Sequence, residues 1–141
     1  MDNKVSISKV INGPIDEVFD AFVNPEIMDQ WHHPDGYTSK NEVEGEKSYK
    51  IHMKKDGDSQ AGIISGKYLT FDRPNKLVFT WAWNWQKDLP PTTVEVDFKK
   101  LDENKTEVSL VHIGFADEIT AKQHAQGWEM ALNNLNNFLA K

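Results

Sequence analysis

Residues Ala116 to Lys141 read ADEITAKQHAQGWEMALNNLNNFLAK, a stretch with no proline and one internal glycine. Apolar side chains recur in it at steps of three and four residues, and charged or amide side chains fall between them. The apolar positions are Ala121, Ala125, Trp128, Ala131, Leu132, Leu135, Phe138 and Leu139. This spacing predicts one amphipathic helix with Asp117 as its N-cap. About 22 helical residues at about 1.5 Å each make a rod of about 33 Å, which needs a broad apolar surface to lie on.

Length, composition and charge limit the class of protein. The chain has 141 residues, of which 27% are charged and 38% hydrophobic, so we expect a single globular domain over residues 1–141. A net charge of −6 disfavours nucleic acid and anionic membrane surfaces as partners. The absence of cysteine excludes disulfides and fits a reducing cytosol. Because no apolar run approaches the roughly 20 residues that span a bilayer, we expect a soluble, cytoplasmic protein without membrane insertion.

The residues before the long helix have the patterns of strands and of two short helices. Residues 5–11 alternate like a strand, and helical spacing follows over residues 15–22 and 27–31. From residue 37 to residue 115 the apolar period is two, which predicts strands joined by short turns. The turns are expected at Asp56-Gly57-Asp58, Asp72-Arg73-Pro74-Asn75, Pro90-Pro91 and Asp102-Glu103-Asn104. The predicted fold class is α+β: a curved antiparallel sheet wrapped around the long C-terminal helix, with two short helices after the first strand.

The alternation also indicates which strand side chains face the long helix. The inward sets are Tyr49, Ile51 and Met53; Leu77, Phe79, Trp81 and Trp83; Val94, Val96 and Phe98; and Val108, Leu110 and His112. Between residues 61 and 71 the phase stays open, because Gly62 and Gly66 allow a β-bulge.

Four stretches resemble a known family over nearly the whole chain. They are PIDEVFDAFVNP (residues 14–25) leading to Trp31, PDGY (34–37), KLVFTWAW (76–83), and HIGF (112–115) followed by QGWEMAL (126–132). On these residues the chain resembles START-like (SRPBCC) domains, in particular the C-terminal domain of the activator of heat-shock-protein-90 ATPase. The resemblance implies a helix-grip fold with an apolar cavity between helix and sheet. Members of the wider superfamily bind lipids, hormones or polyketides, and some catalyse cyclisation or hydrolysis.

An aromatic and apolar set on the predicted inward faces forms the candidate binding site. A sheet that curves round one helix meets it along a line, and aromatic side chains can line the remaining space for an apolar guest. The same side chains could instead simply fill the core. The expected ligand-binding residues are Trp31, Tyr49, Met53, Trp81, Trp83, Phe98, His112, Trp128 and Leu132.

The histidines are the candidates for chemistry. His112 lies on an inward phase and needs partners for both ring nitrogens, which Tyr49, Tyr68 or a ligand could provide. No carboxylate shares its phase, so we expect a structural role or a hydrogen bond to a ligand rather than catalysis. Neighbouring His32 and His33 tend to point apart, so we expect a polar rim there and neither a metal site nor a cofactor.

Two further positions in the sequence stand out. Gly127 costs about 1 kcal/mol relative to alanine in a helix interior. Close approach of the helix to the sheet beside Trp128 is the expected reason, and a hinge that opens the cavity is the alternative. Trp85 lies near a strand end and, if exposed, would mark an entrance or a partner contact.

The sequence therefore supports functions of different classes. The first is a binding module for a hydrophobic or aromatic small molecule. The second is a protein-interaction module that contacts a chaperone or another protein partner, as the family resemblance implies. An enzyme acting on a ligand in the cavity is the third, for which His112 with Tyr49 would be the only nominees.

Overall fold

In the described part of the chain, seven strands form one antiparallel sheet in the order β1-β7-β6-β5-β4-β3-β2, and three helices accompany it. The computed structural model describes residues 3–55, 59–86 and 88–140, so the turn expected at Asp56-Gly57-Asp58 lies outside the described residues. The elements are β1 (Val5–Asn12), α1 (Ile15–Val23), α2 (Pro25–Trp31), β2 (Tyr37–Glu44), β3 (Ser48–Lys55), β4 (Ser59–Asp72), β5 (Lys76–Trp83), β6 (Thr92–Asp102), β7 (Lys105–Ile113) and α3 (Glu118–Leu139).

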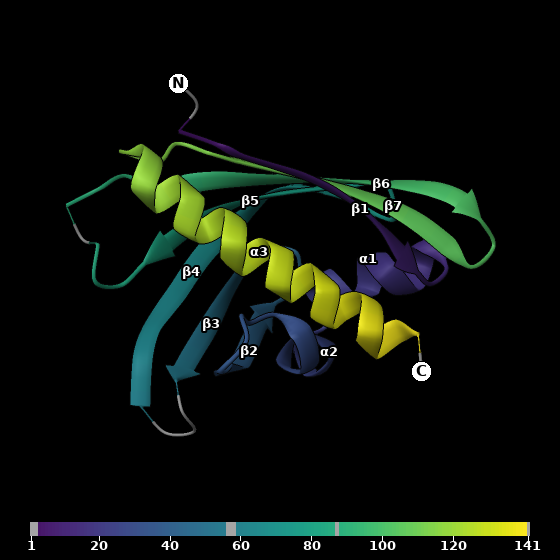
Figure 1. Ribbon diagram of the computed structural model, residues 1–141, viewed down its shortest axis with the longest axis horizontal. Helices are drawn as coiled ribbons and strands as arrows, with labels where there is room; N and C mark the ends of the chain where they lie inside the picture. The colour runs from purple at the N-terminus through teal and green to yellow at the C-terminus, as the bar shows by residue number, and fades with distance from the viewer. Residues whose placement is uncertain (1–2, 56–58, 87, 141) are drawn as a thin grey trace.

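The long C-terminal helix α3 crosses the concave side of the sheet, as the sequence predicted (Figure 1). β1 lies beside it, and so does α2. Its N-cap is Asp117, whose carboxylate accepts a hydrogen bond from the Thr120 backbone N–H at 2.7 Å. That hydrogen bond lowers the pKa of Asp117. The α+β helix-grip architecture is therefore confirmed.

The predicted inward phases of β3, β5, β6 and β7 match the buried positions of these strands. Their inward side chains are buried, apart from Trp83, which is half-buried at the end of β5. Register shifts interrupt β3–β4 pairing after Met53 and β4–β5 pairing after Tyr68. At Gly66 a Cβ atom would lie 1.8 Å from the Thr80 carbonyl oxygen, so only glycine fits there. The irregularity expected around β4 is thus present.

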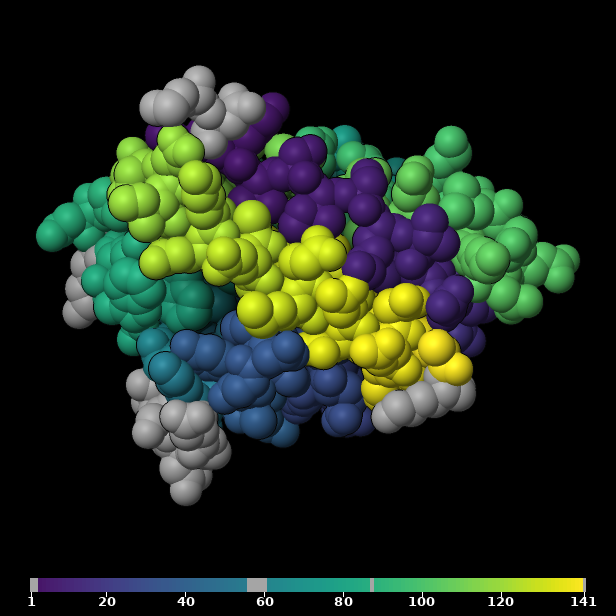
Figure 2. Space-filling view, in the orientation of Figure 1, coloured from purple at the N-terminus to yellow at the C-terminus, as the bar shows by residue number. Residues whose placement is uncertain are grey.

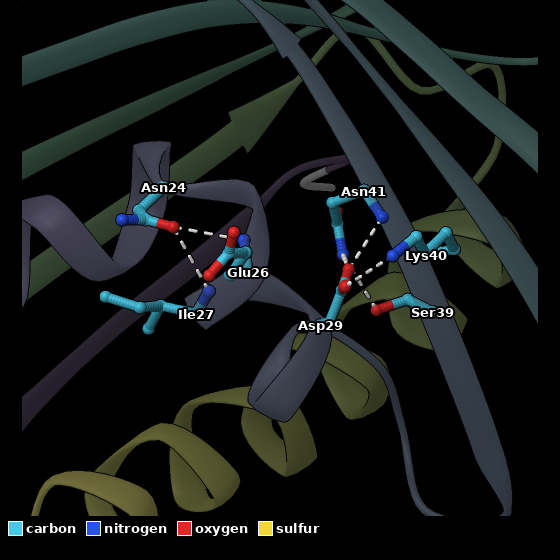
Figure 3. Close-up of polar contacts among 7 residues, drawn as sticks. All are labelled: Asn24, Glu26, Ile27, Asp29, Ser39, Lys40 and Asn41. Atoms are coloured by element: carbon cyan, nitrogen blue, oxygen red, sulfur yellow. Dashed lines mark hydrogen bonds and ion pairs between the residues drawn. The ribbon is translucent and has the colours of Figure 1, made fainter.

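On each edge strand of the sheet, a helix side chain binds one backbone N–H group. At the β2 edge the Asp29 carboxylate of α2 accepts hydrogen bonds from the backbone N–H of Asn41 at 2.7 Å and from its side-chain amide at 2.8 Å (Figure 3). At the β1 edge Asn136 Oδ1 of α3 accepts from the Asn12 N–H at 2.8 Å. Occupied edge groups cannot pair with another chain. Figure 3 also shows the N-cap of α2, where the Asn24 side chain accepts hydrogen bonds from the backbone N–H groups of Glu26 and Ile27.

No helix in the described part of the chain is long and apolar enough to cross a membrane.

The first prediction concerns the packing of α3. Leu135 is fully buried, so Leu135→Ala should lower the free energy of unfolding by about 2–5 kcal/mol, the range for a buried leucine. Asn133→Ala, at an exposed position two residues away, should change it by less than about 0.5 kcal/mol. Urea denaturation of both variants measures the difference. Equal, small effects would mean that this face of α3 is not packed.

Candidate functional site

A cavity of about 580 Å³ lies under the first half of α3. Strands β2 to β5, the segment after α2 and the segment after β5 complete its wall. Figure 2 shows the surface hollowed where the yellow-green half of α3 meets the blue segment after α2 and the teal strands. The lining residues are His32, His33, Pro34, Tyr37, Met53, Ala61, Ile64, Trp81, Trp83, Trp85, Gln86, Thr120, Gln123, His124, Gly127, Trp128 and Ala131.

The cavity has an apolar floor and a more polar rim. The buried lining residues, which form the floor, are His32, Met53, Ile64, Trp81, Trp128 and Ala131. Gln123 is exposed at the rim, and Trp85 is exposed by 58%. Among the described residues that line the cavity, none is Asp, Glu, Lys or Arg. The wall therefore offers aromatic faces and neutral polar groups, and no formal charge when its histidines are neutral.

Gly127 is the position where α3 leaves room for the cavity. A Cβ built there meets no heavy atom within 4 Å, and the residue lines the cavity wall. The expected close approach of α3 to the sheet beside Trp128 is therefore wrong. The glycine lies over open space because the helix spans a gap at this point, and the missing side chain enlarges that gap.

His112 lies in a directional chain of hydrogen bonds behind the floor. The Trp128 indole N–H donates to His112 Nδ1 at 3.0 Å, which leaves the proton on Nε2. Nε2 then donates to Thr92 Oγ1 at 2.7 Å, and the Thr92 hydroxyl donates to the Trp81 carbonyl at 3.0 Å. His112 is thus a fully hydrogen-bonded structural residue. Its partners are Thr92 and Trp128 rather than Tyr49, whose hydroxyl donates to the Thr80 carbonyl, or Tyr68.

His124 forms a second chain of hydrogen bonds, which links α3 to Trp83 in the cavity wall. Its Nδ1–H donates to the Thr120 carbonyl at 2.9 Å, and its Nε2 accepts from the Trp83 indole N–H at 3.1 Å. Trp83 in turn lies against Trp85, with ring centroids 5.4 Å apart. A Cβ at Gly62 would lie 2.8 Å from the Trp83 ring, so this glycine lets the indole pack directly on β4.

Burial lowers the pKa of His32, His112 and His124 and so favours their neutral rings. It lowers the pKa of His32 to about 3, with a smaller contribution from the nearby charge of His33. Burial likewise lowers the pKa of His112 to about 3, assisted by His124. The pKa of His124 is lowered by burial too, against a raising effect of its hydrogen bond to Thr120. Neutral rings are what the two hydrogen-bond chains require, since each uses one ring nitrogen as an acceptor.

The structure brings only part of the predicted site to the cavity. Met53, Trp81, Trp83 and Trp128 line it. The other expected residues lie in the protein interior and outside the wall: Trp31, Tyr49, Phe98, His112 and Leu132.

This corrects the expectation that all nine residues surround one space. The Trp31 indole N–H donates to the Ala21 carbonyl at 2.9 Å inside the core. Phe98 packs on Phe19 and Phe22 with centroids 5.1 and 5.3 Å apart. The inward phase identifies burial, but it does not tell which buried side chains border the gap.

Several lining residues were missed from the sequence. The sequence predicts a polar rim at His32, yet this residue is only 5% exposed and packs its ring edge-on against Trp31 and Trp128. Its burial could have been predicted from its position directly after Trp31 at the end of a short helix, where one further residue still faces inward. Trp85 was expected to mark an entrance or a partner contact if it were exposed, and it is exposed at the cavity rim.

No cluster of three or more His, Cys, Asp or Glu suited to a metal occurs within residues 3–55, 59–86 and 88–140.

A helix gripped by a curved antiparallel sheet, with a cavity between them, is the architecture of START-like domains. The family model described as "Activator of Hsp90 ATPase homolog 1-like protein" matches residues 12–140, and the chain belongs to this family. No curated protein matches the sequence.

Solved structures share the fold at low sequence identity. A protein from Chromobacterium violaceum superposes with a TM-score of 0.89 at 22% identity, covering 100% of this chain and 99% of its own. The AHSA1 protein from Silicibacter pomeroyi gives a TM-score of 0.84 at 19% identity, with 97% of each chain covered. An HSP90 activator from Plasmodium falciparum gives 0.74 at 20% identity, covering 97% of this chain and 96% of its own.

The second prediction tests the open space at Gly127. Gly127→Ala should raise the free energy of unfolding by up to about 1 kcal/mol, because alanine favours the helix and its Cβ meets no atom. The matched substitution Gly66→Ala should destabilise the protein strongly, since its Cβ would collide with the Thr80 carbonyl. Thermal or urea denaturation compares the two. A destabilised Gly127→Ala would restore the close-approach interpretation.

The third prediction is a pH dependence of stability. His32 and His112 take up protons near pH 6.5 in the unfolded chain but only near pH 3 in the folded one. The unfolded state therefore binds more protons in between, and stability should fall as pH drops below about 6.5. Each histidine contributes a slope of up to about 1.4 kcal/mol per pH unit.

His112→Gln isolates one of these contributions. Glutamine can accept from Trp128 and donate to Thr92, so the fold should persist. Urea denaturation between about pH 5 and 6.5 should give a slope smaller than that of the parent chain by up to about 1.4 kcal/mol per pH unit. Identical slopes would show that His112 is protonated in the folded protein.

Proposed function

We propose that this chain is a binding domain whose cavity holds a hydrophobic or aromatic small molecule. The observation that carries the proposal is the composition of the wall: Trp81, Trp128, Met53 and Ile64 on the floor and no charged side chain among the described lining residues. A volume of about 580 Å³ lies within the range of about 300–1,000 Å³ common for small-molecule sites. A guest would supply the dispersion contacts that the wall atoms lack when the cavity is empty.

We further propose that residues 1–141 act as one domain and that the protein works in the cytoplasm. The sheet supports the first point, because it is continuous between its edge strands β1 and β2 and joins strands that are far apart in the sequence. The absence of cysteine supports the second.

A protein-interaction module of the chaperone-ATPase-activator type is the second candidate function. It is supported by the description of the family and by the HSP90 activator among the structures of similar fold. Two large apolar side chains near the cavity rim, Trp85 and Ile119, are exposed by 58% and 72% and could contact a partner. Catalysis has less support, because both nitrogens of His112 already have protein partners in Thr92 and Trp128.

The fourth prediction tests ligand binding. Titration with a hydrophobic fluorophore such as Nile red should give saturable binding, followed by its emission or by tryptophan fluorescence. Gly127→Leu projects a side chain from the cavity wall and should weaken binding at least about tenfold, since it occupies the space of the guest.

Gln126→Leu is the matched control. It adds the same side chain to α3 at an exposed neighbouring position that does not line the cavity, so binding should be retained. Circular dichroism of both variants checks that the helix is intact. Weak, unsaturable binding by all three proteins would contradict the proposal and leave the interaction module as the better-supported function.

A further inference from the structure

Two residues that line the cavity each carry a buried polar side-chain atom without a hydrogen-bond partner. Among the described residues, four buried side-chain polar atoms lack a partner, and Trp81 Nε1 and His32 Nδ1 are two of them. The other two, on Asn41 and Tyr68, belong to residues outside this cavity. Because about 90% or more of buried polar groups in proteins are paired, two unpaired ones in a single wall point to a missing partner.

Trp81 stands apart from the other buried and half-buried tryptophans of the described chain. The indole N–H groups of Trp31, Trp83 and Trp128 donate to Ala21, His124 and His112 respectively. Trp81 is only 7% exposed, and its N–H has no acceptor. A buried donor left unpaired destabilises the protein, so an acceptor brought by a guest would recover part of that lost free energy.

The two unpaired atoms belong to neighbouring rings on the floor. The ring centroids of His32 and Trp81 lie 5.9 Å apart, and both rings adjoin Trp128, with centroids 5.3 and 5.1 Å away. An indole N–H can only donate. His32 can also donate from Nδ1 in the tautomer that carries its proton there. A carbonyl oxygen has two lone pairs and can accept from both.

We propose, building on the binding function argued above, that the guest is an uncharged aromatic molecule with a carbonyl oxygen at its buried end, bound by Trp81 Nε1 and His32 Nδ1. The two atoms are covered in the empty cavity, so the contact requires a rotation of one ring as the guest enters. Polar groups at the other end of the guest would face Gln123, Gln86 and Thr120 at the rim.

The same wall disfavours a carboxylate at the buried end. An anion there would lose its hydration without meeting a cation, because no Lys or Arg is among the described lining residues. Burial holds the pKa of His32 at about 3, so its ring supplies no positive charge near neutral pH. The net charge of −6 adds a weak repulsion. A neutral carbonyl gains the two donors without this desolvation cost.

The fifth prediction compares fluorene with fluorenone, which have nearly the same shape and differ in one carbonyl group. Isothermal titration should show both binding, with fluorenone favoured by on the order of tenfold. Trp81→Phe removes the N–H and keeps an aromatic ring, and His32→Phe does the same for the imidazole. Each variant should lower the fluorenone-to-fluorene affinity ratio, Trp81→Phe by on the order of tenfold, while changes in shape affect both ligands alike.

Tyr68→Phe is the matched control, because it removes another unpaired buried polar atom that lies outside this cavity. Its affinity ratio should equal that of the parent chain. The carbonyl stretching band of bound fluorenone gives a direct readout that does not depend on a variant folding. It should lie below its frequency in a hydrocarbon solvent and shift back upward in Trp81→Phe.

The outcomes separate the two proposals. Fluorene and fluorenone binding equally well, with a carbonyl band as in hydrocarbon, would overturn the carbonyl assignment and leave the apolar binding function supported. An equal drop of the ratio in Tyr68→Phe would also overturn the assignment. Failure of both ligands and of the hydrophobic fluorophore to bind would overturn the binding function and this inference together.

Discussion

The packing of a straight helix across a curved sheet is the constraint on which the rest of this structure depends. The C-terminal half of α3 is held firmly, since Leu132 and Leu135 are fully buried and Asn136 bonds the end of β1. Asn134 adds a hydrogen bond to the His33 carbonyl at 3.1 Å, which ties α3 to the segment after α2. A rod fixed along one end of a curved surface separates from it at the other. The cavity beneath Gly127 is that separation.

In the half of α3 over the cavity, hydrogen bonds between histidines and tryptophans add to the packing of Trp128. Trp128 is fixed by His112, and Trp83 is fixed to the helix by His124. Both pairs need an imidazole nitrogen that accepts, so protonation would replace an acceptor with a donor facing another N–H. The position of Trp128 in the cavity wall and the loss of stability in acid that we predict for His112 therefore have the same origin. The one cavity indole among the buried tryptophans that lacks such a partner, Trp81, is the one that we assign to a guest.

The fold was predictable from the sequence because periodicity reports which side chains are buried. The apolar stripe of α3 that includes Leu135, the N-cap at Asp117 and the inward phases of the strands all follow from local patterns. The candidate site was only partly predictable, because Trp31 and Phe98 have the same inward phase as Trp81 and Trp83. Which of them border empty space depends on where α3 leaves the sheet, a property of the assembled fold. The place lies at Gly127, but a glycine in a helix is compatible both with close approach to the sheet and with open space, so the sequence alone could not distinguish the two.

The five tryptophans allow the central claim to be tested in one measurement. Each indole N–H gives its own resonance in a ¹⁵N-correlated NMR spectrum, and a saturating apolar guest such as fluorene can be added. Binding in the cavity under α3 predicts large shifts for Trp81, Trp83 and Trp128, and little change for Trp31, whose N–H is sealed in the core against the Ala21 carbonyl. A spectrum in which no indole shifts, or in which Trp31 shifts as much as the cavity tryptophans, would contradict the account.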